Sequence, residues 1–172
     1  MKKNLTFMTR TALLLALTLV FQMSRPLFPP NVSTFVVGSL VNAALMIAAG
    51  TVGIAGAVLI SVIAPIIAFL QQHIKFIWMV PIVMIGNVII VIVFGLLFKK
   101  NQWVAMISGA VLKFVFLWFA IVQLALPLVG MKGPAANAII FSFSWPQLVT
   151  AILGGILAIT VIKALDGIVK KK

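Results

Sequence analysis

Few side chains in this sequence are suited to acid–base, nucleophilic or metal chemistry. The chain of 172 residues has one acidic residue, Asp166, one histidine, His73, and no cysteine. Paired carboxylates, a thiolate nucleophile and a metal-binding cluster are therefore missing from the sequence. We predict that the protein is not an enzyme and that it needs no metal and no cofactor. Its polar residues are instead candidates for binding a ligand.

The most informative polar residue is Lys113. It lies about ten residues into the apolar run 103–126, which corresponds to a depth of roughly 15 Å at 1.5 Å per helical residue. An ionisable side chain at that depth indicates a functional site, and no carboxylate inside the apolar runs can pair with it. An anionic or strongly polar ligand would be a suitable partner. The alternative is that the ammonium group extends along its own stem to the lipid headgroups.

Two asparagines lie midway along other apolar runs, Asn87 in 77–98 and Asn42 in 35–49. A buried amide needs a hydrogen-bond partner, which is either a ligand or a neighbouring helix. For Asn87 both roles are equally suitable, whereas for Asn42 we favour the bond between helices. Further candidates for ligand binding lie near the ends of the apolar runs: Arg25, Trp78, Gln123, Trp145 and Gln147.

These end residues have alternative roles as well. Tryptophans at such positions are more often anchors in the membrane interface, which is the alternative for Trp78 and Trp145. A pocket for a small planar solute nevertheless combines aromatic faces with converging amides. We expect His73 to be a solvated loop residue.

The composition shows what kind of structure positions these residues. Hydrophobic residues make up 64% of the chain and charged residues only 8%, against about 25% charged in soluble domains. Most of the surface must therefore face lipid. The basic residues lie at the ends of the apolar runs and not on one interleaved face, which argues against nucleic-acid binding. We predict an all-α integral membrane protein with a single domain, residues 1–172.

We predict six transmembrane helices in this domain. The second and third runs are shorter than the roughly 20 residues that span a bilayer, so four or five spans is the alternative. The segment 135–144 is ambiguous between a loop and an early turn of the last helix. The expected helices are 5–23, 35–49, 54–70, 77–98, 103–126 and 145–168.

The distribution of lysine and arginine predicts the orientation. Nine of the 13 basic residues lie on the side of the two termini, and three, Arg25, Lys75 and Lys132, lie on the other side. Cytoplasmic loops of membrane proteins are enriched in lysine and arginine. We therefore expect both termini in the cytoplasm of a multi-pass protein of a bacterial plasma membrane.

The sequence carries no recognisable energy source for transport. It has no GxxxxGK[ST] phosphate-binding loop and no carboxylate within the apolar runs that could relay protons or bind sodium. By elimination, we predict a binding subunit that depends on a partner for energy. A self-sufficient channel or carrier and a membrane assembly subunit remain the alternatives.

The start of the first apolar run, Arg10–Leu17, has alanines at positions 12 and 16. Small residues at this spacing allow another helix to approach closely, and packing within the chain is the commoner use. The pattern resembles the first-helix Ala-xxx-Ala motif of the substrate-binding S components of energy-coupling factor (ECF) vitamin importers, although Val20 stands where a third alanine would follow. The stretches 37–42 and 84–87 also resemble such proteins.

This resemblance implies a mechanism. An S component captures a vitamin or vitamin precursor at the outer face, then associates with a membrane scaffold subunit and two cytoplasmic ATPases to release it inside. The resemblance implies that Ala12 and Ala16 dock on the scaffold. The missing membrane carboxylates argue against a permanently cationic solute. The chain most resembles S components for hydroxymethylpyrimidine or pyridoxine-type solutes, while pantothenate and other vitamins stay open.

Overall fold

The computed structural model describes residues 2–169, and all regular structure in this range is helical. Met1 and the predicted cytoplasmic lysines 170–172 lie outside the described residues. The elements are α1 (Lys2–Met23), η1 (Arg25–Leu27), α2 (Pro30–Thr51), α3 (Ile54–Leu70), α4 (Met79–Leu97), α5 (Gln102–Leu117), η2 (Trp118–Ala125), α6 (Leu126–Val129), α7 (Pro134–Phe143) and α8 (Trp145–Val169).

Within the described residues, five helical segments are long and apolar enough to cross a membrane, and α3 is a shorter apolar helix of 17 residues. The prediction of an all-helical, multi-pass membrane protein is therefore confirmed at this level. The expected six helices correspond to these five segments and α3. The five segments are Asn4–Leu27, Val32–Thr51, Met79–Leu97, Gln102–Val129 and Pro134–Gly167.

Two regions differ most from the sequence-based prediction. The second helix was expected over 35–49, but α2 begins at Pro30 and has 22 residues. Proline is well suited to the first helical position, where its missing N–H costs no hydrogen bond, so the Pro-rich segment starts the helix. The ambiguous segment 135–144 is largely helical, since α7 begins at Pro134 and ends one residue before Ser144.

The fifth apolar run is not a uniform α-helix. It begins as α5, continues as the eight-residue π-helix η2 and ends in the short α6. Asn101 caps its start, because the side-chain Oδ1 accepts hydrogen bonds from the backbone N–H groups of Trp103 and Val104 at 3.0 and 3.1 Å. Gly130, in the left-handed conformation at φ 66°, ends it.

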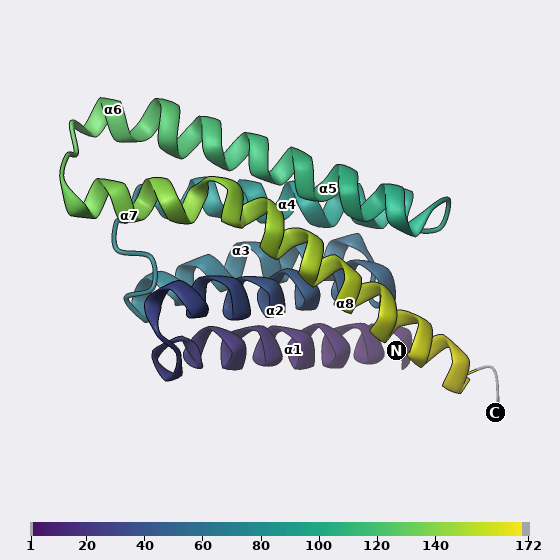
Figure 1. Cartoon of the computed structure of the whole chain (residues 1–172). Coiled ribbons are helices and arrows are strands. Elements are labelled where there is room, and N and C mark those ends of the chain that lie inside the picture. The colour runs from purple at the N-terminus through teal and green to yellow at the C-terminus, as the bar shows by residue number, and fades with distance from the viewer. Residues whose placement is uncertain (1, 170–172) are drawn as a thin grey trace.

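The helices form one bundle whose two ends differ (Figure 1). Both chain ends lie at one end of the bundle, and the connections that follow α1, α3 and α6 lie at the opposite end. Arg25, Lys75 and Lys132 belong to these three connections and therefore lie on one side of the bundle, as the alternation of spans predicts. Which side faces the cytoplasm stays a prediction.

The helix α2 lies at the centre of the bundle and packs most extensively on α8. Gly154 in α8 permits this close approach, because a Cβ atom there would lie 2.6 Å from the backbone oxygen of Ser39 and 2.7 Å from Cβ of Asn42. Small residues of this kind let membrane helices pack at short distance. The largest buried cluster surrounds the crossing and includes Leu45, Met46, Ile60, Ile90, Phe94 and Ile159.

Candidate functional site

Lys113 is the centre of a polar network inside the bundle. Its side chain is only 4% exposed, and Nζ donates hydrogen bonds to Oδ1 of Asn42 at 2.6 Å and to Oδ1 of Asn87 at 2.8 Å. These bonds join α5 to α2 and α4. Hydrogen bonds from an ammonium group are stronger than those between neutral partners. The alternative in which Lys113 extends to the lipid headgroups is therefore wrong.

The network continues from Asn42 into α8. Asn42 Nδ2 donates to the hydroxyl oxygen of Thr150 at 3.3 Å, and that hydroxyl donates to the backbone oxygen of Gln147 at 3.1 Å. The expected role of Asn42 as a bond between helices is confirmed. Asn87 has the same role through its Oδ1, while its Nδ2 group donates to no acceptor among the described residues. That group is free to meet a ligand.

A cavity of about 300 Å³ adjoins this network, and its lining reaches η1 and the connection between α3 and α4. Its volume is at the lower limit of the range typical of small-molecule sites. Lys113, Asn42 and Asn87 line its deep part, which we call the floor. Apolar side chains of Val37, Met79, Val83, Leu117, Ile139 and Phe143 form part of the wall.

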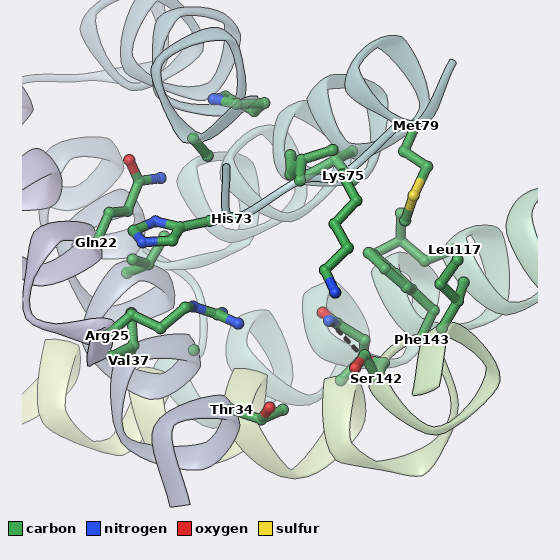
Figure 2. A pocket seen from close by; sticks show the side chains of 18 of the residues that line it. Gln22, Arg25, Thr34, Val37, His73, Lys75, Met79, Leu117, Ser142 and Phe143 are labelled. Carbon is green, nitrogen blue, oxygen red and sulfur yellow. Dashed lines mark hydrogen bonds between the residues drawn. The ribbon is translucent and has the colours of Figure 1, made fainter. Parts of the chain in front are cut away.

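Four polar residues line the outer part of the cavity, which we call the mouth: Gln22, Arg25, His73 and Lys75. In Figure 2, the side chains of Arg25 and Lys75 extend into the same space from different sides, and the ring of His73 lies beside Arg25. Gln147 and Ser142 also line the cavity, and Gln147 Nε2 donates to the backbone oxygen of Ser142 at 3.0 Å. The site is thus enclosed by helices at its floor and largely by connecting segments at its mouth.

Two polar groups in the mouth lack partners within residues 2–169. Gln22 is 9% exposed, and its Nε2 donates to the backbone oxygen of Ala64 at 3.4 Å, while its Oε1 accepts no hydrogen bond. His73 Nδ1 is also buried without a partner. Partial burial, and secondarily the positive charge of Arg25, lower the pKa of His73 from its usual value of 6.5. The neutral ring is therefore favoured near pH 7.

Five of the eight predicted ligand-binding residues line this cavity: Lys113, Asn42, Asn87, Arg25 and Gln147. The other three are not part of its lining. Trp145 is 53% exposed and contacts Phe35 and Phe141, and Trp78 stacks on Phe76 at 6.0 Å between ring centroids. Gln123 is exposed on η2. For these three residues, a contact with the solute stays a prediction that the cavity does not support.

Some site residues were missed or misjudged in the sequence. His73 was expected to be solvated, but its ring is partly buried in the mouth. This happens because the connection between α3 and α4 folds back over the bundle. The sequence pattern does not identify Lys75 or Thr150 as members of the site. For Thr150 a signal was available, because it is a single polar residue within an apolar run, one helical turn after Gln147. No feature of the sequence indicates that the side chain of Lys75 extends into the cavity.

The alanine pair of the first helix lies on its outer face. Ala12 and Ala16 are both exposed, while Thr11 and Thr18 face the bundle and are buried. Packing within the chain, the commoner use of such a pair, is therefore not its role here. The helix α1 as a whole is the most peripheral of the long spans, with 11% of its apolar window buried against 61% for α2. Its outer face is open to lipid or to a partner.

Comparison with known proteins agrees with this geometry. A family model described as ECF transporter, substrate-specific component, matches residues 6–165. No curated protein and no solved structure matches the chain. S components are substrate-binding membrane subunits and are not enzymes themselves. Since the match covers nearly the whole chain, the protein belongs to the family of substrate-specific components of ECF transporters.

Proposed function

We propose that this protein captures a water-soluble vitamin or vitamin precursor at the outer face of the plasma membrane. It then delivers the solute inward together with a membrane scaffold subunit and two cytoplasmic ATPases. The observation that carries the proposal is the cavity of about 300 Å³ whose floor holds a buried lysine between two amides. A site of this kind binds one small polar molecule by hydrogen bonds and apolar contact.

The floor supports a specific role for Lys113 and Asn87. Two N–H groups of the ammonium are used by Asn42 and Asn87, which leaves a third for the solute. The free amide nitrogen of Asn87 offers another donor. We therefore assign these two residues to acceptor atoms of the solute, with hydroxymethylpyrimidine, pyridoxine-type molecules and pantothenate as the candidates.

The first experiment is native mass spectrometry of the purified chain, followed by binding measurements with a panel of vitamins. A stoichiometric small molecule released from the protein would identify the solute. A chain that carries no solute and binds none of the panel would contradict the proposal. Solute flux into liposomes that contain this chain alone would instead favour a self-sufficient carrier.

The exposed alanines of α1 support docking on the scaffold subunit. We expect Ala16→Leu to abolish assembly with the scaffold and ATPases while solute binding is unchanged, because a larger side chain prevents close approach of a second helix. Ala164→Leu, at an exposed position of α8, is the matched control. Assembly by the Ala16 variant, measured by co-purification, would contradict this role.

The proposed orientation can be tested with introduced cysteines. The natural chain has none, so each introduced thiol is unique. We expect a membrane-impermeant maleimide to label Lys132→Cys from outside intact cells and to leave Lys100→Cys unlabelled until the cells are opened. The reverse pattern would place the cavity mouth in the cytoplasm and would contradict capture from outside.

A further inference from the structure

The charges that line the cavity are all of one sign. Arg25 reaches it from η1, Lys75 from the connection between α3 and α4, and Lys113 from α5. No aspartate or glutamate is part of the lining. The only acidic residue of the sequence, Asp166, is exposed near the far end of α8. Among the described residues, the cavity therefore has an excess of positive charge without a counter-ion.

The geometry of the mouth concentrates this charge. The guanidinium group of Arg25 and the ammonium group of Lys75 extend into one space from different sides (Figure 2). Lys75 is exposed and Arg25 is partly buried, and two cations that face one space repel each other unless an anion lies between them. Arginine is moreover suited to planar carboxylates and to phosphates, because its N–H groups form two parallel hydrogen bonds.

We propose that the solute is an organic acid, with its anionic group between Arg25 and Lys75. This inference rests on the proposed function and narrows its substrate class. The apolar wall residues, such as Leu117 and Phe143, contact the hydrocarbon body of the solute, and Lys113 and Asn87 bind a neutral acceptor at the floor. A neutral pyrimidine or pyridine alcohol leaves the cations of the mouth unpaired.

The test compares an acid with its neutral analogue on the full chain in lipid nanodiscs. Pantothenate and the corresponding alcohol, pantothenol, differ only in the carboxylate, and nicotinate with nicotinamide is a second pair. We expect the acid of at least one pair to bind about tenfold tighter than its neutral analogue, as isothermal titration measures. Arg25→Gln and Lys75→Gln should each remove most of this preference, because each weakens binding of the acid more than binding of the neutral analogue.

Lys132→Gln is the matched control, since it removes an exposed charge that does not line the cavity. Equal affinity for acid and neutral analogue, or a preference that survives both mouth variants, overturns the inference while the proposed function stands. If no panel member binds, the solute that co-purifies is extracted and its charge at pH 7 is determined. An anion supports the inference and a neutral or cationic molecule overturns it. The complete absence of a solute contradicts the proposed function itself.

Discussion

The floor and the mouth of the cavity are built differently. At the floor, Lys113, Asn42 and Asn87 belong to three long helices, and their side chains are at most 4% exposed and joined by hydrogen bonds of 2.6 and 2.8 Å. At the mouth, Arg25, His73 and Lys75 lie in η1 and in a connecting segment, and two polar atoms there have no partner within the described residues.

This difference indicates separate tasks. The floor is organised by helix packing without a solute, so in the proposed function it would set the depth and orientation of binding at little entropic cost. The mouth holds charges that lack partners among the described residues, and in the proposed function a bound solute would supply those partners. The following predictions test this division, beginning with the largest expected effect.

Breaking the support of the floor should have the largest effect. Gly154→Val places a side chain against the backbone of Ser39 and against Asn42, so α8 must move away from α2. Overpacking of this kind costs about 1–3 kcal/mol and more where backbone must shift. We expect the unfolding temperature to fall by about 5 °C or more and solute binding to be lost. Gly167→Val, where nothing lies within 4 Å of the added Cβ, should change neither quantity.

Removal of the positive charge at the floor should have the second-largest effect. We expect Lys113→Met to weaken solute binding by more than about tenfold, or about 1.4 kcal/mol, because it removes the donor that meets the solute. The protein should still fold, since methionine fills a similar volume and no charge is left unpaired. It should lose some stability, because Oδ1 of Asn42 and Oδ1 of Asn87 each lose a hydrogen-bond donor. Unchanged affinity in a folded variant would show that Lys113 only joins the helices.

The sequence was sufficient to predict the floor, and the physical reason is the membrane. An ionisable or amide side chain inside an apolar run has few alternatives to a buried network, so Lys113, Asn42 and Asn87 stood out at once. Hydropathy likewise identified the apolar runs. It did not show which helix is central, since α1 and α2 both have 22 residues and only packing determines that α2 is buried.

The mouth could not be predicted in the same way. A polar residue in a connecting segment is solvated unless the chain happens to fold over a cavity, and this depends on the path between two helices. His73 and Lys75 were therefore misjudged or passed over, although they line the site. Conversely, Trp78 and Trp145 were selected by residue type, but their contacts are with other aromatic rings.

The dependence of solute affinity on salt concentration should distinguish the mouth from the floor, with a smaller effect than the two substitutions above. Charges near water are screened at physiological ionic strength, whereas buried ones are screened much less. We expect the affinity for an acidic solute to fall about threefold between 50 and 500 mM NaCl, and Arg25→Gln to remove most of that dependence. Lys113→Met should lower the affinity and leave the salt dependence in place. Identical salt dependence in the wild type and the Arg25 variant would contradict the proposed separation of tasks between the floor and the mouth.

The smallest effect concerns pH and involves His73. Its pKa is lowered by partial burial and by Arg25, so protonation opposes folding. The stability of the empty protein should therefore be highest above about pH 6.5, the usual pKa, and decrease slightly as the pH falls from there toward the lowered pKa. A solute anion beside Arg25 neutralises the charge that opposes protonation and raises the pKa of His73, so binding takes up a proton.

Affinity for an acid should consequently increase by about twofold to threefold between pH 7.5 and 5.5, opposite in direction to the stability of the empty protein. The acid itself stays ionised over this range, because carboxyl pKa values lie near 4. The other cations of the cavity, Arg25, Lys75 and Lys113, are retained in His73→Gln. Titration of that variant should show a smaller increase in affinity toward low pH than the wild type, and an increase as large as that of the wild type would mean that the proton is taken up elsewhere.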